Sequence, residues 1–267
     1  MKRPERMNAL LELLGERGRL DVDEAATALE VSAATMRRDM DALAEQQLLK
    51  RTRGGAVLSS VTYDLPIRYK GGHHAAQKRA VAEAAAGKVS SGDVVGLSGG
   101  TTTTEIARVL ATRPEFADPG PHPHLTIVTN SLNIAYELAV RPQIKIVVTG
   151  GVAHSRSFEL SGTLGELVLK QLTLDVAFIG VNGIDPQWGA TVHDEAEATT
   201  NRLMAQRSAE AVAVTDSSKV GRRCFAHVGG PDVFGMLITD DGMDESARED
   251  FTGGGWKVQT APPSDDG

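Results

Sequence analysis

The sequence predicts an α/β protein in two parts: a small helical unit with a β-hairpin, and a larger unit with a mostly parallel sheet. Residues 31–55, VSAATMRRDMDALAEQQLLKRTRGG, combine an amphipathic helix with a basic segment that ends in two glycines. From residue 77 onward helical and strand patterns alternate, which is typical of parallel sheets covered by helices. The 267 residues, 41% of them hydrophobic, are enough for two domains with separate cores.

Composition limits the class of protein. The single cysteine, Cys224, excludes a disulfide framework and favours a reducing cytoplasm. No apolar run is long enough to span a bilayer, so we expect no membrane association. The net charge is −7, yet residues 1–58 hold ten basic and ten acidic residues. The overall charge argues against nonspecific coating of nucleic acid, and the positive charge of this part is local.

Three short helices precede the basic segment. Hydrophobic spacing predicts a first helix over 4–16 and a second that begins at Asp21 or Asp23. A third helix follows Ser32, whose hydroxyl can cap it. Glu30 stands in the turn between the last two helices, where such turns often need a left-handed residue. The residues expected to be buried are Met7, Leu10, Leu11, Leu14, Val22, Ala25, Ala26, Leu29, Met36, Met40 and Leu43. Three helices and a hairpin predict a winged helix-turn-helix.

The third helix and the hairpin are candidates for DNA contact. At about 100° per residue, Ala34 and Arg38 point away from the core, with Thr35 and Arg37 on the flanks. Small, hydroxyl and arginine side chains at the start of a helix fit a DNA major groove, and basic hairpin residues fit phosphates. The candidate DNA-binding residues are Ser32, Ala34, Thr35, Arg37, Arg38, Lys50, Arg51 and Arg53. The alternative is that Arg37 and Arg38 pair with Asp41 or Glu45 on a solvated face.

The domain boundaries follow from the same patterns. We expect the winged helix-turn-helix over 1–58, a linker over 59–76, the α/β domain over 77–255 and a tail over 256–267. His73 and His74 are interpreted as solvated linker histidines, because no third metal ligand lies at suitable spacing. Residues 113–124 are expected to form a surface loop. The expected helices are 77–89, 105–111, 131–139, 163–172, 198–209 and 243–251, and the expected strands are 93–98, 125–130, 144–151, 175–184, 210–216 and 236–240.

Small polar residues follow five of these strands, and ligands of parallel sheets bind beyond the carboxyl ends of the strands. The first strand leads into a glycine–threonine loop and a helix, an arrangement that can hold phosphate. Any one such end could be an ordinary cap or turn, but five on one edge favour a phosphorylated ligand. The candidate ligand residues at these ends are Gly99, Gly100, Thr101, Thr102, Thr103, Asn130, Ser131, Gly150, Gly151, Asn182, Gly183 and Lys219.

These motifs resemble the DeoR-type bacterial transcription regulators. The block VSAATMRRDMDALAEQQLLKRTRGGAV resembles their N-terminal signature. The segments GGTTTTEIARVL, TNSLNIAYELA, VVTGG, DVAFIGVNGID and VTDSSKVG resemble their sensor domain, in the same order over 77–240. The resemblance implies operator DNA as a partner and a repressor of carbohydrate metabolism genes. It also implies a sheet fold related to ribose-5-phosphate isomerase and glucosamine-6-phosphate deaminase, with a sugar phosphate as effector.

One departure from the family bears on the ligand. Many relatives carry an acid before the glycine–threonine loop, whereas Leu97 and Ser98 stand here. Asp175, Asp194 and Glu195 are candidate acceptors for sugar hydroxyls. The alternative is that Asp175 caps a strand and that Asp194 and Glu195 open a helix; both interpretations stay open.

Two other functions were weighed against a regulator. A sugar-phosphate isomerase or deaminase would need an acid and a base with shifted pKa values. The deaminase pattern expects a histidine near the end of the glycine-containing strand, but Ile184 and Asp185 follow Gly183, and His193 is assigned to a loop. A pure interaction module leaves the basic hairpin and the glycine–threonine loop unexplained. The sequence therefore predicts a regulator without enzymatic activity, cofactor or metal, which forms a homodimer or homotetramer to read paired half-sites.

Overall fold

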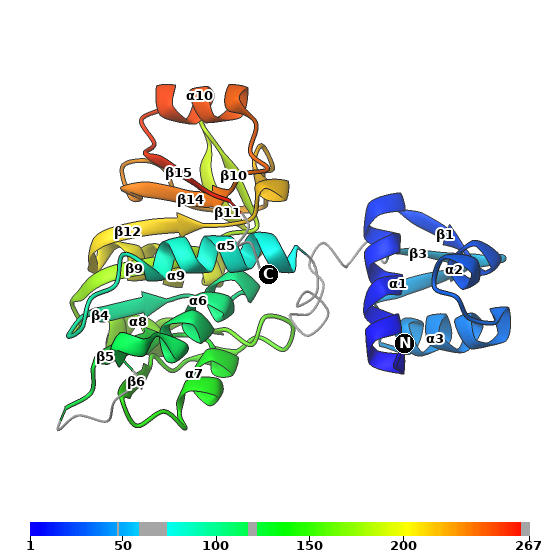
Figure 1. Ribbon diagram of the computed structural model, residues 1–267, viewed down its shortest axis with the longest axis horizontal. Helices are drawn as coiled ribbons and strands as arrows, with labels where there is room; N and C mark the ends of the chain where they lie inside the picture. Colours follow the sequence, from blue (N-terminus) through cyan, green and yellow to red (C-terminus); the bar gives the residue numbers. More distant parts are fainter. Residues whose placement is uncertain (47, 59–73, 117–121, 263–267) are drawn as a thin grey trace. The chain divides into compact units, whose positions relative to one another are not determined.

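The computed structural model describes residues 1–46, 48–58, 74–116 and 122–262. The chain divides into two compact units, Met1–His73 and His74–Gly267, and each is described by itself (Figure 1). Most of the predicted linker, with His73, lies outside the described residues. Its last two residues already belong to a helix that begins at Ala75, because the alanine-rich pattern starts two residues earlier than expected.

The first unit is the predicted winged helix-turn-helix with one additional strand. Its three helices pack around a core that contains all eleven of the expected residues. The additional strand β1 pairs with β3, so the wing is part of a three-stranded antiparallel sheet in the order β1-β3-β2. The elements are α1 (Arg3–Arg17), β1 (Arg19–Asp21), α2 (Val22–Ala28), α3 (Ala33–Glu45), β2 (Leu49–Thr52) and β3 (Gly55–Leu58).

Two backbone positions shape this unit. Glu30 has a φ of 53°, so the left-handed turn expected there is confirmed. Gly55 lies where β3 meets β1, and a Cβ atom at this position would come within 2.2 Å of the carbonyl oxygen of Leu20. The second glycine of the wing is therefore required for strand pairing.

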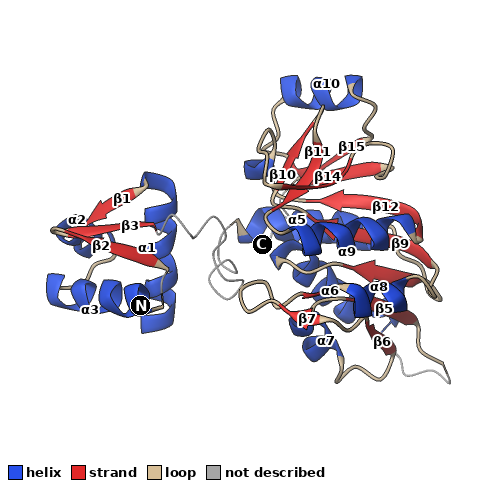
Figure 2. Ribbon diagram, turned by 180° about the vertical axis from the view of Figure 1, so that it is seen from behind, coloured by secondary structure: helices blue, strands red, loops and turns tan. Residues whose placement is uncertain are grey.

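The second unit is built on a seven-stranded sheet whose neighbouring strands are all parallel, as predicted (Figure 2). The strand order is β15-β14-β12-β9-β4-β5-β6. These strands are β4 (Val94–Leu97), β5 (Leu125–Thr129), β6 (Ile144–Val148), β9 (Leu174–Gly180), β12 (Ser208–Val214), β14 (Met236–Asp240) and β15 (Val258–Ala261).

Helices cover both faces of this sheet, and each face has its own apolar core. The α5, α6 and α7 helices pack on one face, and α8, α9 and α10 pack on the other. Valine and isoleucine fill the central strands because both of their faces are buried. The helices are α5 (Ala75–Ala86), α6 (Thr101–Thr112), α7 (Leu132–Leu138), α8 (Thr163–Leu169), α9 (Glu195–Gln206) and α10 (Glu245–Gly253), with 3-10 turns η1 (Pro114–Phe116) and η2 (Ser217–Lys219).

Two small antiparallel sheets complete this unit. One is a hairpin of β7 (Val152–Ala153) and β8 (Leu160–Ser161). The other has the order β10-β11-β13 and contains β10 (Gly183–Asp185), β11 (Gly189–Val192) and β13 (Ala226–Gly229). The predicted strand over 175–184 is therefore two strands in different sheets. The chain changes sheets after Gly180, where the backbone N–H of Asn182 donates to the carbonyl of Thr191 at 3.0 Å.

The prediction of a C-terminal tail over 256–267 is wrong for residues 256–261, which are part of the fold. Trp256 is 2% exposed and lies near the rings of Phe234 and Phe251, with centroid distances of 6.1 and 5.8 Å. The strand β15 then pairs with β14 as the edge of the main sheet. Burial of this aromatic cluster holds the segment in place. None of the described helices combines the length and the apolar character that a membrane span requires.

Candidate functional site

The start of α3 presents the residues proposed to contact DNA. The hydroxyl of Ser32 accepts a hydrogen bond from the backbone N–H of Thr35 at 3.2 Å, as a helix cap does. Ala34 is exposed, and Arg37 and Arg38 are exposed in the next turn. The first turns of α3 therefore offer a small side chain, a hydroxyl and two guanidinium groups to solvent.

The proposed pairing of Arg37 or Arg38 with a carboxylate of the same helix is not found. Within the described residues neither arginine forms an ion pair, and the carboxylate of Asp41 lies 2.9 Å from Nε of Arg51 instead. Asp39 is buried and pairs with Arg6 of α1 at 2.6 Å. The acidic residues of α3 thus hold the domain together and leave the outer arginines available.

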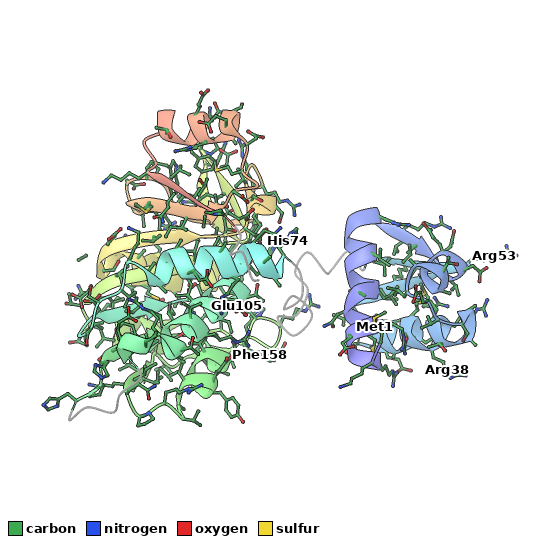
Figure 3. All side chains as sticks on the ribbon, viewed as in Figure 1. Met1, Arg38, Arg53, His74, Glu105 and Phe158 are labelled. Carbon is green, nitrogen blue, oxygen red and sulfur yellow. The ribbon has the colours of Figure 1, made fainter. Side chains whose placement is uncertain are left out.

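Arg51 differs in this respect from the other basic residues of the wing. Its guanidinium also donates to the carbonyl of Gly55 at 2.9 Å, so the side chain ties the wing to α3. Lys50 and Arg53 are exposed and form no ion pair within the described residues. Arg38 and Arg53 both project from the side of the unit away from α1 (Figure 3).

In the second unit, the five strand ends predicted to bind a ligand lie next to one another. The strands β12, β9, β4, β5 and β6 are consecutive in the sheet and parallel, so their carboxyl ends form one edge, here called the carboxyl edge. Gly180, at the end of β9, contacts the loop after β4, because a Cβ atom there would lie 3.1 Å from the carbonyl oxygen of Gly99.

The α6 helix starts at this edge without a side-chain cap. Its N-cap is Gly100, with a φ of 126°, so no side chain satisfies the first N–H groups of the helix. The hydroxyls of Thr103 and Thr104 donate to the Gly100 carbonyl at 3.1 and 2.7 Å. Within the described residues, the hydroxyls of Thr101 and Thr102 form no hydrogen bond. Free N–H groups, two hydroxyls and the positive end of the helix dipole suit a phosphate.

Asn130, after β5, is fully buried beside this loop. Its Nδ2 donates to the carboxylate of Glu159 at 3.1 Å and to the carbonyl of Leu160 at 3.3 Å, which fixes the orientation of the amide. Its Oδ1 is buried without a hydrogen-bond partner. An amide oxygen in this state can accept a hydrogen bond from a ligand hydroxyl.

Glu159 is an acidic residue of the edge that sequence reasoning missed. It lies just before β8, is 5% exposed, and packs directly on Gly99. A Cβ atom at position 99 would lie 2.1 Å from Cγ of Glu159. Gly99 of the glycine–threonine loop, called the phosphate loop from here on, therefore makes room for this carboxylate. No regular spacing marks the segment around Glu159, and only its proximity in the fold reveals it.

The hairpin that carries Glu159 also contacts polar side chains at the start of α9. The hydroxyl of Ser157 donates to the buried carboxylate of Glu197 at 2.6 Å. The Nδ1 atom of His154 lies 3.9 Å from the same carboxylate, and its Nε2 lies 3.7 Å from Asp194. The β7–β8 hairpin thus brings Glu159 beside the loop before α6 and Ser157 beside the start of α9.

Lys219, in η2 after β12, supplies a cation at the edge. Its Nζ donates to the carbonyl of Val181 at 3.2 Å and lies 3.8 Å from the carboxylate of Asp216. Burial alone raises the pKa of Asp216, but the charge of Lys219 and the hydroxyl of Ser218, followed by the charges of His74 and Lys78, hold the pKa below 3.8. Asp216 therefore stays ionised and keeps Lys219 beside the end of β9.

The glycines at the other strand ends have different roles. Gly150, with a φ of 80°, has open space where a Cβ atom would lie. Gly151 and Gly183 are closely packed instead, because a Cβ atom would lie 2.5 Å from the carbonyl oxygen of Ser161 or 2.6 Å from that of Arg222. Gly150 is thus available to a ligand, whereas Gly151 and Gly183 serve packing.

The assignment of Asp175 to the ligand site is wrong. Its carboxylate accepts a hydrogen bond from the backbone N–H of Val94 at 2.7 Å. Both residues lie where their strands begin, and the strands are parallel. Asp175 therefore caps the opposite edge of the sheet.

Asp194 and Glu195 lie at the start of α9. Asp194 caps this helix by accepting from the N–H groups of Ala196 and Glu197, both at 2.9 Å. The alternative of a helix-opening residue is therefore confirmed for Asp194. Glu195 is the first residue of α9 and is exposed.

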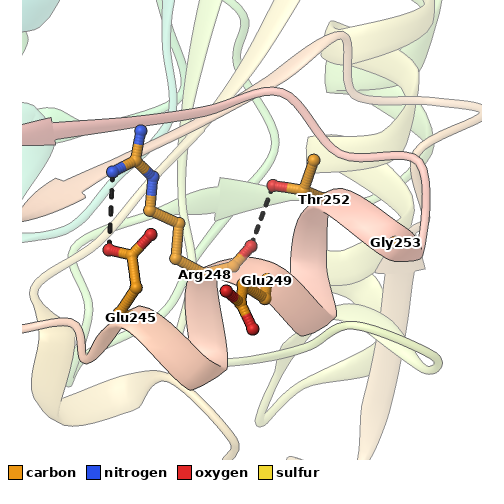
Figure 4. A pocket seen from close by; sticks show the side chains of 5 residues that line it. All are labelled: Glu245, Arg248, Glu249, Thr252 and Gly253. Carbon is orange, nitrogen blue, oxygen red and sulfur yellow. Dashed lines mark hydrogen bonds and ion pairs between the residues drawn. The ribbon is translucent and has the colours of Figure 1, made fainter.

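A separate surface pocket lies over α10, at the other end of the sheet from β6 (Figure 4). The pocket is lined by Glu245, Arg248, Glu249, Thr252 and Gly253. Arg248 pairs with Glu245 at 3.6 Å, and the hydroxyl of Thr252 donates to the Arg248 carbonyl at 2.8 Å. All lining residues belong to one helix, and the one arginine among them is already paired within that helix, so this pocket does not resemble a built ligand site.

Comparison with known families covers both units. A DeoR-like helix-turn-helix domain matches residues 6–62, and a DeoR C terminal sensor domain matches residues 73–241. The glycerol-3-phosphate regulon repressor of Escherichia coli (strain K12) is 31% identical over 243 residues, which is 90% of this chain and 92% of the relative. The HTH-type transcriptional regulator GlpR of Haloferax volcanii is 32% identical over 255 residues, which is 95% of this chain and 96% of the relative.

Similarity to solved structures is weak. A D-ribose-5-phosphate isomerase in complex with phospho-erythronic acid has a TM-score of 0.39 at 21% identity, and the match covers 54% of this chain and 52% of that one. The full-length sorbitol operon regulator SorC from Klebsiella pneumoniae has a TM-score of 0.41 at 12% identity, and the match covers 93% of this chain and 99% of that one. Neither similarity bears on function.

Proposed function

Because this chain belongs to the DeoR family of DNA-binding transcription regulators, we propose that it is a repressor whose operator affinity is set by a phosphorylated sugar at the carboxyl edge. The relatives that match over most of the chain are transcription regulators, so the chain is a regulator and not an enzyme. One of them is a repressor of a glycerol-3-phosphate regulon. A phosphorylated polyol or sugar as effector of this chain agrees with that name.

The observation that carries the proposal is that the carboxyl edge offers both donors and acceptors. The α6 helix offers uncapped N–H groups and the hydroxyls of Thr101 and Thr102. Next to these donors, Asn130 and Glu159 offer acceptor oxygens, and Glu159 packs on Gly99 of the same loop. Phosphate requires donors, and sugar hydroxyls donate to carboxylate and amide oxygens. A ligand with a phosphate at one end and hydroxyls at the other satisfies both sets.

Lys219 and Glu159 orient the ligand. Val181, which binds Lys219, follows Gly180, and Gly180 contacts Gly99 and Thr103 of the phosphate loop. The ammonium group thus favours phosphate at the start of α6. The buried carboxylate of Glu159 accepts hydrogen bonds and therefore favours the hydroxyl groups of the ligand.

The first unit reads DNA through α3 and its wing. Arg37 and Arg38 extend from the helix that enters the major groove, and Lys50 and Arg53 contact phosphates beside it. Arg51 positions the wing through its contacts with Asp41 and Gly55. The effector controls this unit if its affinity differs between the DNA-bound and free states, a coupling that is typically about 1–3 kcal/mol.

The experiment measures fluorescence anisotropy of the full chain on a DNA sequence obtained by in vitro selection, in the presence of a panel of sugar phosphates. We expect at least one member to change the operator affinity, and the dephosphorylated sugar to have no effect. Lys219→Ala should abolish this response without altering affinity in the absence of ligand. Lys257→Ala is the matched control, because Lys257 is exposed and precedes β15, at the edge of the sheet opposite to the carboxyl edge. An equal response in Lys219→Ala and wild type would contradict the site.

The same assay tests the reader. Arg38→Ala should remove specific binding, with a loss of about 1–3 kcal/mol for one base-contacting arginine. Arg17→Ala, which removes the same charge from the end of α1, is the control. If Arg38→Ala prefers the selected DNA over random DNA as strongly as Arg17→Ala does, α3 is not the helix that reads the operator.

A further inference from the structure

One side of α7 and the turn that follows it carry an exposed apolar stripe. Leu132, Tyr136 and Val140 follow at intervals of four residues and are 41%, 86% and 77% exposed. The charged and polar contacts of this helix point elsewhere: Asn133 and Glu137 bond to Thr104 and Arg108 of α6. The stripe therefore faces away from α6, which is its neighbour on the sheet.

A second group of exposed apolar residues lies across β6 from this stripe. In α8, Leu164 and Leu167 are 66% and 55% exposed, and in β7, Val152 is 74% exposed. The α8 helix packs on the other face of the sheet. Its Leu169 belongs to the apolar core of that face, and the nearby Leu172 packs against this core, as residues of β5 and β6 also do. The strand β6 is one of the two edge strands of the seven-stranded sheet, opposite to β15.

The two groups meet at the carboxyl end of β6. The backbone N–H of Leu132 donates to the carbonyl of Phe158, in the β7–β8 hairpin, at 3.0 Å. Gly165 of α8 packs on the loop after β6, because a Cβ atom there would lie 2.8 Å from the carbonyl oxygen of Gly150. The stripe of α7, the tip of β7 and the outer side of α8 therefore border one surface around the edge strand. We call these six residues the β6 edge patch.

The size of this patch matches one half of a stable interface. With about 150–200 Å² for a fully exposed large residue, the six exposed fractions correspond to roughly 700 Å². A standard interface buries about 800 Å² on each partner. Soluble monomers rarely expose contiguous apolar surface of this extent.

The two helices of the patch carry few charges that would oppose an identical partner, and the edge strand β6 exposes Lys145. Across a two-fold axis the same patch meets itself, so a charge without a partner in its own copy repels its equivalent when it lies near the axis. The only charged residue in α7 is Glu137, which pairs with Arg108 at 2.6 Å, and the only one in α8 is Glu166, which pairs with Lys170 at 3.4 Å. Both pairs form inside one copy.

We propose that the β6 edge patch docks a second copy of this chain, related by a two-fold axis. Regulators of this type read two half-sites with two symmetric readers, and to this extent the inference rests on the proposed function. In the first unit, Met1 is the only large hydrophobic residue that the described part exposes, so pairing falls to the second unit.

The test measures the mass of the full chain by sedimentation equilibrium at micromolar concentration, without DNA or effector. Wild type should have twice the chain mass of 28.3 kDa, or four times that mass if a second interface exists. Tyr136→Glu/Leu167→Glu places a charge on each half of the patch and should halve the mass. Trp188→Glu/Phe225→Glu adds the same charge at exposed aromatic residues, 60% and 82% exposed, outside the patch. This control should keep the wild-type mass.

The milder Tyr136→Ser/Val140→Ser variant removes apolar surface without charge and should raise the dissociation constant at least about tenfold. Circular dichroism checks that each variant is folded. A monomeric wild type, or an unchanged mass in folded Tyr136→Glu/Leu167→Glu, would overturn the proposal. Because the measurement contains neither DNA nor sugar phosphate, its failure is distinguishable from failure of the proposed function.

Discussion

A Gly99→Ala substitution tests whether Glu159 forms a wall of the ligand site. The φ angle of Gly99 is not in the left-handed region, so alanine is compatible with the backbone. The added Cβ atom would lie 2.1 Å from Cγ, 2.4 Å from Cδ and 2.6 Å from Oε1 of Glu159, and contacts below 3.0 Å essentially never occur. The Glu159 side chain must therefore leave its place.

The expected destabilisation follows from two effects. Overpacking a buried site by one methyl group is destabilising by about 1–3 kcal/mol. Displacement of Glu159 also breaks the 3.1 Å hydrogen bond from Asn130 Nδ2, and bonds to charged groups contribute about 1.5–3 kcal/mol. Part of this strain is relieved by relaxation, so we expect a net loss of about 2–3 kcal/mol. For a domain of this size, this loss lowers Tm by roughly 4–12 °C.

Thermal unfolding followed by circular dichroism measures this loss in a double-mutant cycle with Glu159→Ala. Alanine at 159 lacks all three atoms that would clash, so Gly99→Ala should be nearly neutral in that background. Gly100→Ala is the matched control. Its cost arises from a φ of 126°, with Thr103 Oγ1 at 3.5 Å as the nearest atom, and should be the same in both backgrounds. If Gly99→Ala is equally destabilising with and without Glu159, the carboxylate does not occupy the place described.

Three further predictions concern single side chains. Asp216→Asn should lower stability by about 1–3 kcal/mol at neutral pH. Because the pKa of Asp216 in the folded protein lies below 3.8 despite burial, this contribution is lost as the pH falls through that pKa. A Tm difference between Asp216→Asn and wild type that persists in strong acid would contradict the prediction. Trp256→Ala should lower stability by about 3–5 kcal/mol, whereas Trp188→Ala, at a 60% exposed site, should have a small effect in the same urea titration. Arg53→Ala should reduce the salt slope of DNA binding by about one, whereas Arg51→Ala should leave the slope unchanged and lower the Tm, since Arg51 bonds within the unit.

Hydrophobic periodicity predicted the long elements of the fold. The helix expected over 4–16 is α1 (Arg3–Arg17), and the strand expected over 125–130 is β5 (Leu125–Thr129). The strands β7 and β8 are too short for periodicity, with two residues each, and they form only because they pair with each other. The strand β15 was missed because its order depends on the burial of Trp256, whose ring partners are Phe234, before β14, and Phe251, in α10.

In the candidate site, too, local sequence patterns could be predicted, whereas contacts between distant segments could not. The loop around Gly100 could be found because glycines, threonines and the following helix are adjacent in sequence. Glu159 could not, because it reaches this loop only through the hairpin after β6. The error at Asp175 was avoidable: a residue at the beginning of a parallel strand lies at the edge opposite to the ligand.

The β7–β8 hairpin connects two surfaces that otherwise lie on different sides of the fold. Seven positions after Val152, which is exposed on its outer strand, the same hairpin delivers Glu159 to the loop before α6. A ligand that displaces the Glu159 side chain therefore acts on the same hairpin that carries the exposed strand β7. In the proposed dimer, this one short hairpin joins the ligand site to the β6 edge patch.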